Sequence, residues 1–216
     1  MSLILIFKYD GRFMKTGILI CGLNGVGKST FGKALAQKLN FHFIDNEDLY
    51  FPKTDPNYMY AFSRSREEVE ELLNQEIEAH ENFVFVSVKG DYKIVEEGLA
   101  AKAGKFLENS PLSKTENEIK WYVILIEIPR EIRLERVRNR SFKKFGDRIK
   151  PGGDLWEKEE HFFNIVKSRS EDTVKKWVET VGCTVIRLDG MKSVEENLDF
   201  CLKRFSAEVY NGESDK

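Results

Sequence analysis

The sequence predicts an α/β fold of three layers, with helices on both faces of a five-stranded parallel sheet. Short runs of β-forming residues alternate with longer segments in which apolar residues recur every three to four positions. A glycine-rich turn follows the first of these runs. With 216 residues, 41% of them apolar, the chain has enough length and apolar material for one such core.

Each expected element rests on its local pattern. The five strands are expected at residues 17–21, 41–44, 83–88, 121–127 and 184–188. Helices with one apolar face are expected at residues 31–39, 67–80, 160–181 and 193–205. Polar residues 167–172 interrupt the third of these, which indicates a bend or a break. Segment 104–120 is polar and reads as a surface excursion, whereas the basic, glycine-rich segment 141–154 suits a mobile flap.

The same patterns predict a single domain over residues 1–216. We expect its core at residues 15–206 and a lid inserted at residues 141–160. Residues 1–13 and 207–216 are expected to be terminal extensions. Met14 is a candidate for the natural start, because the residues that follow it already lead into the first strand.

Charge and cysteine content narrow the function classes. The chain has 34 Lys and Arg against 36 Asp and Glu, a formal net charge of −2. It lacks the overall field that favours nucleic acid or anionic lipid, so a nucleic-acid partner is disfavoured. The three cysteines, Cys21, Cys183 and Cys201, lack metal-binding spacing, and Cys21 is expected to be buried. Neither a signal peptide nor a membrane span is recognisable, so we expect a cytoplasmic protein without membrane contact.

Residues 22–30, GLNGVGKST, lie between the first expected strand and the first expected helix. Gly22, Gly27, Lys28 and Ser29 have the spacing of a P-loop, whose glycines let successive amides turn toward an anion at the positive end of a helix. We expect Lys28 to bridge the β- and γ-phosphates of ATP and Ser29 to hold Mg²⁺. The alternative is a chance glycine-rich turn. The expected nucleotide-binding residues of this segment are Gly22, Asn24, Gly25, Val26, Gly27, Lys28, Ser29 and Thr30.

Acidic residues follow the second expected strand, namely Asp45, Glu47 and Asp48. The carboxyl ends of parallel strands form the ligand crevice of an open α/β sheet. We expect Asp45 to bind Mg²⁺ and to orient an attacking hydroxyl, and Glu47 to contact the phosphate acceptor. Alternatively, these acids are helix caps, with Asp45 or Asn46 capping a short helix.

Further candidates for acceptor binding flank the third strand. Lys89, Gly90 and Asp91 follow it, and Gly90 allows close approach of a ligand that Lys89 or Asp91 contacts. An ordinary strand-to-helix turn is the alternative. Arg64 and Arg66 precede an expected helix and are either acceptor ligands or solvated surface charges.

A basic helix is expected before the flap. Three of its four arginines fall within about 60° of one another at 100° per residue: Arg133, Arg136 and Arg140. Arg138 points to the opposite side. Three guanidinium groups on one stripe repel unless an anion faces them, so we expect them to face the triphosphate of ATP. The alternative is a charged outer face balanced by Glu131 and Glu135.

The stretch GLNGVGKSTFGKALAQKLNFHFIDNED resembles the shikimate kinase and gluconate kinase branch of the P-loop kinases, which are related to adenylate kinase and other nucleoside monophosphate kinases. The similarity includes Gly32 and the interval from Lys28 to Asp45, and it extends over residues 15–206. It implies a P-loop NTPase fold of three α/β/α layers with the strand order 2-3-1-4-5. ATP and Mg²⁺ are the implied cofactors.

The resemblance continues in the lid. Residues 135–140, ERVRNR, are similar to the lid-entry motif of these kinases. The resemblance implies that Arg136 packs on adenine, that Arg140 reaches the phosphates, and that Arg169 is the lid-exit arginine. It also implies that the turn at residues 187–190 contacts adenine.

Two strand ends depart from those kinases. Shikimate kinases have Asp-x-Asp after the second strand, whereas this chain has Asp45, Asn46 and Glu47, and the longer glutamate puts shikimate in doubt. After the third strand the chain lacks the Asp-Gly-x-Pro-Arg of monophosphate kinases. The missing arginine weighs against a monophosphate acceptor, although Arg64 and Arg66 lie where a substitute is expected.

These observations predict an ATP-dependent phosphotransferase that moves the γ-phosphate of MgATP to a hydroxyl group of a small molecule. Its expected catalytic residues are Lys28, Asp45, Arg136 and Arg140. The alternatives are a nucleoside monophosphate kinase, a regulatory module that hydrolyses ATP slowly, and a nucleic-acid end kinase. His42, His80 and His161 have no catalytic partner by spacing and are expected to be structural or surface residues. Both a monomer and a homodimer stay open.

Overall fold

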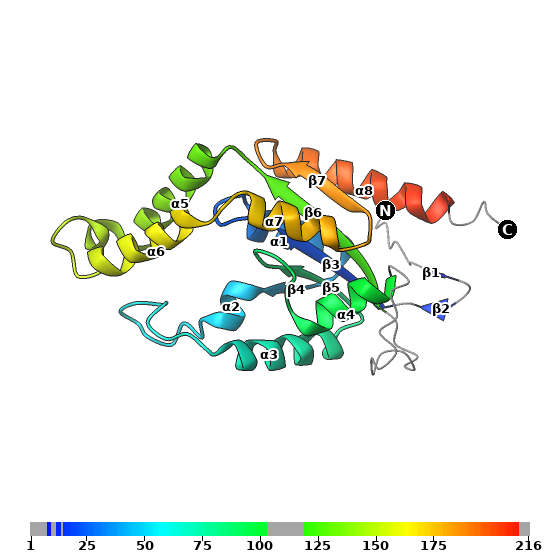
Figure 1. The fold of residues 1–216 in the computed structure, drawn as a ribbon, viewed down its shortest axis with the longest axis horizontal. Helices are drawn as coiled ribbons and strands as arrows, with labels where there is room; N and C mark the ends of the chain where they lie inside the picture. Colours follow the sequence, from blue (N-terminus) through cyan, green and yellow to red (C-terminus); the bar gives the residue numbers. More distant parts are fainter. Residues whose placement is uncertain (1–7, 10–11, 14, 103–118, 212–216) are drawn as a thin grey trace.

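The computed structural model of the chain describes residues 8–9, 12–13, 15–102 and 119–211. Its body is a five-stranded parallel sheet (Figure 1). The strands are β3 (Lys15–Cys21), β4 (His42–Asp45), β5 (Asn82–Val86), β6 (Ile119–Glu127) and β7 (Val185–Asp189). Their order across the sheet is β4-β5-β3-β6-β7. This is the predicted order 2-3-1-4-5.

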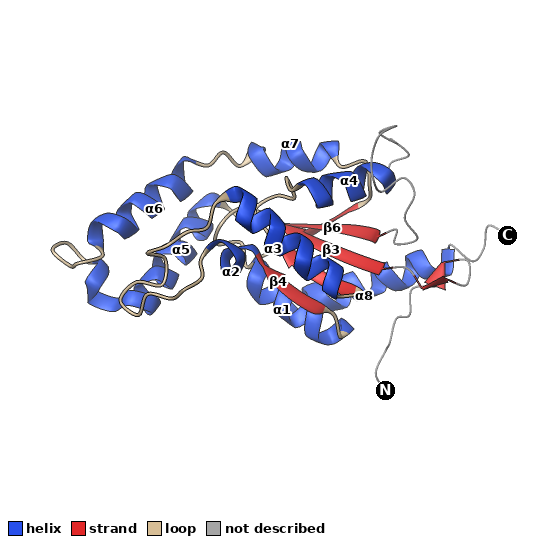
Figure 2. Cartoon of the chain, turned by 90° about the horizontal axis from the view of Figure 1, so that it is seen from below, coloured by secondary structure: helices blue, strands red, loops and turns tan. Residues whose placement is uncertain are grey.

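Helices cover both faces of this sheet (Figures 1 and 2). The helices are α1 (Lys28–Leu39), α2 (Asn46–Tyr50), α3 (Arg66–Ala79), α4 (Lys93–Lys102), α5 (Arg130–Phe145), α6 (Trp156–Ser168), α7 (Asp172–Thr180) and α8 (Val194–Asn211). Helices α1 and α8 pack on one face, and α3, α4 and α7 pack on the other. The predicted three-layer α/β/α fold is therefore confirmed.

The central strand β3 divides its side chains between these two layers. Ile18 and Ile20 belong to the core beneath α1 and α8, whereas Leu19 and Cys21 belong to the core beneath α3, α4 and α7. Successive side chains of a strand point to opposite faces, and a parallel sheet is buried on both. Cys21 is buried as predicted, and this burial raises the pKa of its thiol to about 12.

The structure shows which alternative holds at one predicted interruption and extends one predicted helix. The interruption at residues 167–172 is a break, because α6 ends at Ser168 and α7 begins at Asp172. The terminal extension predicted at residues 207–216 begins inside α8, which continues to Asn211. Once a helix has formed, each added residue gains one further hydrogen bond. A helix can therefore continue beyond the last residue of its apolar face.

The other irregular segments are described only in part. Residues 119 and 120 of the predicted surface excursion belong to β6, and its remaining residues lie outside the described part of the chain. In the predicted N-terminal extension, β1 (Lys8–Tyr9) pairs with β2 (Arg12–Phe13) in an antiparallel arrangement separate from the main sheet. Met14 and residues 212–216 lie outside the described residues.

The predicted lid lies beyond the carboxyl ends of the strands (Figures 1 and 2). Its residues 141–145 end α5, residues 156–160 begin α6, and the short 3-10 helix η2 (Gly146–Ile149) follows α5 directly. The segment is therefore mostly helical. Within the described residues, we find no helix with both the length and the apolar composition needed to cross a membrane.

Candidate phosphoryl-transfer site

The P-loop at residues 22–27 joins β3 to α1 at the carboxyl edge of the sheet. Gly22, Gly25 and Gly27 have φ values of 142°, 92° and 102°. A side chain at Gly25 is also excluded by contact, because its Cβ would lie 2.4 Å from a carbonyl oxygen of α5. Gly27 is the N-cap of α1, and no side chain of the described residues caps this helix. The first amides of α1 therefore face the place where an anion is favoured.

Lys28 is the first residue of α1, and its side chain curls back over the loop. Its Nζ donates to the carbonyl oxygen of Leu23 at 3.1 Å. Burial lowers the pKa of the Lys28 amino group to about 8, the carboxylate of Asp45 opposes this shift, and the guanidinium groups of Arg140 and Arg169 add to it. The structure thus brings the predicted lysine, the predicted carboxylate and two lid arginines into one electrostatic neighbourhood.

Asp45 ends β4 and is also the N-cap of α2. Its Oδ1 accepts a hydrogen bond from the Glu47 amide at 2.9 Å, so the helix cap considered as an alternative is present. The cap uses one carboxylate oxygen. The second oxygen and the hydroxyl of Ser29, in the first turn of α1, are the oxygen ligands that Mg²⁺ prefers. These residues fit a Mg²⁺ ion beside the phosphates that Lys28 would hold.

Arg133 departs from the predicted arginine stripe. It is fully buried, and its Nη2 lies 2.7 Å from Oε1 of Glu171, between α6 and α7. Its Nη1 donates to the carbonyl oxygen of Asn24 at 3.3 Å. The guanidinium group therefore supports the P-loop from behind and does not face a triphosphate, so this part of the prediction was wrong.

The remaining residues of the P-loop differ in their surroundings. The side-chain oxygen of Asn24 accepts a hydrogen bond from Arg169, which lies just after α6. Val26 is buried in the core beneath α1. Thr30 is exposed in the first turn of α1. Arg169 therefore contacts the loop through Asn24, whereas Val26 contributes packing.

The other three arginines of α5 have separate partners. Arg136 donates to the carbonyl oxygen of Gly190 at 3.1 Å, so it reaches the turn after β7 that was expected to contact adenine. Arg138 lies on the opposite side, as predicted, and pairs with Glu160 at 2.7 Å. Arg140 lies 3.5 Å from Oε2 of Glu47. Of the predicted stripe, Arg136 therefore contacts the turn after β7 and Arg140 contacts Glu47.

Glu47 is the centre of a polar cluster between the acceptor side and the lid. Its carboxylate accepts a hydrogen bond from the Tyr60 hydroxyl at 2.8 Å, and Lys144 lies 3.6 Å from it. Lys53 is 3.7 Å away. Burial alone would raise the pKa of Glu47, but Arg140, Lys144, the Tyr60 hydroxyl and Lys53 together hold it below its usual value. Glu47 is therefore an anion that cations from two segments compensate.

Residues 51–65 connect α2 to α3 and contact the lid. The hydroxyl of Tyr58 donates to Glu159 of α6 at 2.8 Å, and Arg148 donates to the Asn57 carbonyl at 2.7 Å. Lys144 donates to the Tyr60 hydroxyl. Sequence reasoning missed these contacts. The available signal was the aromatic pattern NYMYAF in an otherwise polar loop.

Arg64 and Arg66 have protein partners. Arg64 Nη1 donates to the carbonyl oxygen of Leu49 at 2.7 Å. Arg66 donates to the Asp91 carbonyl, and its guanidinium carbon lies 3.8 Å from the centre of the Tyr92 ring. Each guanidinium group is thus engaged with local structure around α2, α3 and the turn after β5.

The turn after β5 is also internally paired. Lys89 Nζ lies 3.0 Å from a carboxylate oxygen of Asp91. Gly90 is buried, and a Cβ there would lie 2.6 Å from Leu19 and 3.0 Å from Trp177. Core side chains therefore occupy the space beside Gly90 where a ligand was expected.

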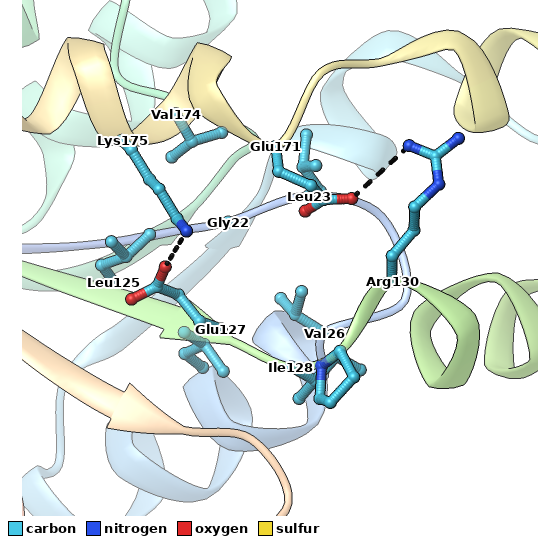
Figure 3. Close-up of a pocket in the computed structure, with 12 residues that line it drawn as sticks. Gly22, Leu23, Val26, Leu125, Glu127, Ile128, Arg130, Glu171, Val174 and Lys175 are labelled. Atoms are coloured by element: carbon cyan, nitrogen blue, oxygen red, sulfur yellow. Dashed lines mark ion pairs between the residues drawn. The ribbon is translucent and has the colours of Figure 1, made fainter.

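A cavity of about 270 Å³ adjoins the P-loop on the side of α7 (Figure 3). The loop lines it with Gly22, Leu23 and Val26. Across it, Lys175 lies 3.4 Å from Glu127. Arg130 and Glu171, both in its lining, lie 4.0 Å apart. Its charged groups are paired with one another, and Lys28, Asp45 and Arg140 are not in its lining.

The chain is similar to known proteins in sequence and in structure. The AAA domain family matches residues 18–160. The chain is 26% identical over 207 residues to the uncharacterized protein YqaC of Bacillus subtilis (strain 168), covering 90% of this chain and 99% of that protein. It is 27% identical over 145 residues to a shikimate kinase of Vibrio parahaemolyticus serotype O3:K6, covering 62% of this chain and 84% of that enzyme. A gluconokinase from Sinorhizobium meliloti 1021 is structurally similar, with a TM-score of 0.49, 14% identity and coverage of 93% of this chain and 97% of that one.

Proposed function

The chain belongs to the AAA domain family, in its P-loop kinase group, and we propose that it moves the γ-phosphate of MgATP to a hydroxyl group of a small molecule. The observation that carries this proposal is the P-loop at the uncapped start of α1, with the Lys28 Nζ lying over the loop at 3.1 Å from the Leu23 carbonyl oxygen. Asp45, Arg140 and Arg169 are near enough to influence the pKa of Lys28. Phosphoryl transfer requires positioning and neutralisation of the charge on the transferring group more than covalent chemistry. Lys28, Arg140 and Arg169 supply cations for this task, and Asp45 and Glu47 are the acids beside them.

Each side chain has a role in this proposal. Lys28 and the amides of the P-loop bind the β- and γ-phosphates, and Arg140 approaches them from the lid. Mg²⁺, held by Ser29 and Asp45, would neutralise phosphate charge. Asp45 would also accept the proton of the attacking hydroxyl. Arg136, beside the turn after β7, would pack on the adenine.

The acceptor side supports a hydroxyl acceptor over a phosphate. Two of its described cations are bound to backbone carbonyl oxygens, Arg64 at Leu49 and Arg66 at Asp91. The match to proteins named shikimate kinase supports a small-molecule acceptor. Glu47 at the second acidic position argues against shikimate itself.

An ATP-consumption screen tests the proposal. Purified protein is given MgATP with panels of hydroxylated metabolites and of nucleoside monophosphates, and ADP formation is measured. Lys28→Ala should abolish acceptor-dependent turnover, because the charge on the phosphates is no longer neutralised. Lys38→Ala is the matched control, since Lys38 is exposed near the other end of α1. Circular dichroism should show that both variants keep the fold.

The outcomes separate the alternatives. Turnover that depends on a hydroxylated metabolite and is lost in Asp45→Asn supports the proposal. Turnover with a nucleoside monophosphate would move the acceptor to a phosphate. ADP formation that no acceptor stimulates would favour a slow ATPase with a regulatory role. Full activity of Lys28→Ala would overturn the assignment of the P-loop.

A further inference from the structure

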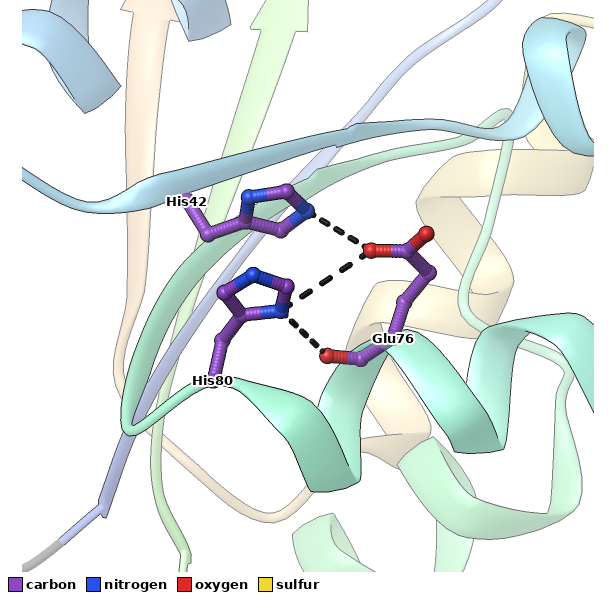
Figure 4. A group of neighbouring side chains, drawn as sticks. All are labelled: His42, Glu76 and His80. Atoms are coloured by element: carbon purple, nitrogen blue, oxygen red, sulfur yellow. Dashed lines mark hydrogen bonds and ion pairs between the residues drawn. The ribbon is translucent and has the colours of Figure 1, made fainter.

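Two histidines and a glutamate meet at the amino-terminal end of β4, away from Asp45 at the other end of the same strand (Figure 4). His42 is the first residue of β4, and Glu76 and His80 lie one turn apart at the end of α3. His42 Nε2 is 2.7 Å from Glu76 Oε2, and His80 Nδ1 is 3.8 Å from the same oxygen. One carboxylate oxygen therefore lies beside a nitrogen of each ring.

The imidazole rings of His42 and His80 stack on each other. Their centroids are 3.4 Å apart and their planes differ by 2°. Neutral imidazole binds metal ions through the lone pair of one ring nitrogen. The three potential ligand atoms lie within 4.8 Å of one another. Tetrahedral Zn²⁺, with Zn–N bonds of about 2.0 Å, holds its ligand atoms about 3.3 Å apart. The spacing of the three atoms is close to this, and the two parallel rings must turn toward each other for both to bind one ion.

The surroundings favour a cation at this place. The carbonyl groups at the end of α3 form the negative end of its dipole, and none of the residues in its last turn is basic. The nearest lysine on β3, Lys15, already interacts with Glu78 and Glu81 and donates to the Glu78 carbonyl oxygen at 3.4 Å. A bound cation would therefore offset the negative charge that the end of α3 gathers.

His80 can change partners to complete the set. Its Nδ1 lies 2.9 Å from the Glu76 carbonyl oxygen, so in the absence of a metal the ring donates from that nitrogen. Binding a metal through Nδ1 moves the ring proton to Nε2. The side chains of His42, Glu76 and His80 are 34%, 40% and 36% exposed. Water can therefore relay the proton from Nδ1 to Nε2 and occupy a fourth coordination position.

We propose that His42, Glu76 and His80 form a binding site for a divalent transition-metal ion of the Zn²⁺ type. Two imidazoles and one carboxylate suit Zn²⁺, whereas Mg²⁺ prefers oxygen ligands, so this site is chemically distinct from the one expected beside ATP. The metal would join the edge strand β4 to α3. It would thereby stabilise the strand that ends in Asp45.

The test is titration of tag-free, EDTA-treated protein with ZnCl₂ alone, followed by isothermal calorimetry. Wild-type protein should bind one Zn²⁺ per chain. His42→Ala and His80→Ala should each weaken this binding at least about tenfold, the lower end of what even outer-shell changes cost metal sites. His161→Ala is the matched control, because His161 is exposed on α6 and should leave the affinity unchanged. Cys183→Ser controls for binding by a thiol.

Further readouts separate loss of ligand from loss of fold. Zn²⁺ should raise the unfolding temperature of wild-type protein and of Lys28→Ala, but not of His42→Ala or His80→Ala. Co²⁺ should give the visible absorption of a tetrahedral site only where both histidines are present. The proposal would be overturned if the wild-type protein bound no Zn²⁺, or if His42→Ala and His80→Ala bound Zn²⁺ as tightly as the wild type. Because the titration contains neither nucleotide nor acceptor, its failure is independent of the proposed kinase activity.

Discussion

The lowered pKa of Lys28 predicts that MgATP binds more weakly as the pH rises through about 8. In the free protein the amino group loses its proton above that pH. A triphosphate beside it favours the ammonium form and returns the pKa toward the ordinary value of 10.5. Binding is then coupled to the uptake of one proton. With these two pKa values, the dissociation constant should rise about tenfold between pH 7 and pH 9, or about 1.4 kcal/mol.

Calorimetry with MgATP at pH 7, 8 and 9, in pairs of buffers with different ionisation enthalpies, measures both quantities. The number of protons taken up should approach one at pH 9 and fall to a small fraction at pH 7. Lys28→Arg is the control, because its guanidinium group stays charged and its affinity should be flat across this range. Equal wild-type affinity at pH 7 and pH 9, without proton uptake, would refute the reasoning.

Two further predictions concern the P-loop and the contact with the lid. Gly25→Ala should lower the free energy of unfolding more than Gly27→Ala does, because a Cβ at Gly25 would lie 2.4 Å from a carbonyl oxygen whereas one at Gly27 meets no described atom within 4 Å. Both variants bear the backbone strain of positive φ, about 1–3 kcal/mol, so urea unfolding isolates the contact. Glu47→Gln should speed amide hydrogen exchange in residues 141–154 of the nucleotide-free protein, because it removes the charge that holds the lid cations and weakens the bond to Tyr60.

Controls make these two predictions specific. An equal loss of stability in both glycine variants would show that the contact at Gly25 is relieved by local movement. For the lid, Asp147→Asn is the control, because Asp147 pairs only with the nearby Lys150 among its described ion-pair partners. Exchange in Glu47→Gln that matches the control would contradict a role for Glu47 in holding the lid. The pKa of Glu47 lies below its usual value, so its charge and this contact should persist at pH 5 and be lost only as the pH falls through that lower pKa.

The fold and the P-loop could be predicted from sequence because their signals are local. The strands β3, β5 and β6 contain continuous apolar runs, and the spacing from Gly22 to Ser29 is contained in one turn between a strand and a helix. The strand order required the resemblance to a known family, because periodicity within a strand does not identify its neighbour. The parallel pairing of β3 with both β5 and β6 then agrees with that order.

The prediction for Arg133 shows that helix geometry alone does not identify the partner of a side chain. The angle between Arg133 and Arg136 on α5 was correctly derived, but an angle does not identify the facing element. Glu171 lies 38 residues later, in the break between α6 and α7, and it binds the Arg133 guanidinium group. A buried cation and its carboxylate are brought together by tertiary packing, which a helical projection omits.

The same limit applies to Glu47 and to the histidine cluster. The position of Glu47 at the end of a strand was predicted, but its partners Tyr60 and Lys144 come from two distant segments. The spacing of Glu76 and His80 on one helix was visible in the sequence. Their proximity to His42 required the packing of β4 against α3, which no spacing rule provides.

The linker at residues 169–171 is connected to both the side chain and the backbone of one P-loop residue, Asn24. Arg169 donates to the side chain of Asn24, and Glu171 binds Arg133, which donates to the Asn24 carbonyl oxygen. A ligand that moves Asn24 must therefore also move residues 169–171 or break these hydrogen bonds. Ligand binding at the P-loop is consequently coupled to the position of the chain that leaves the lid.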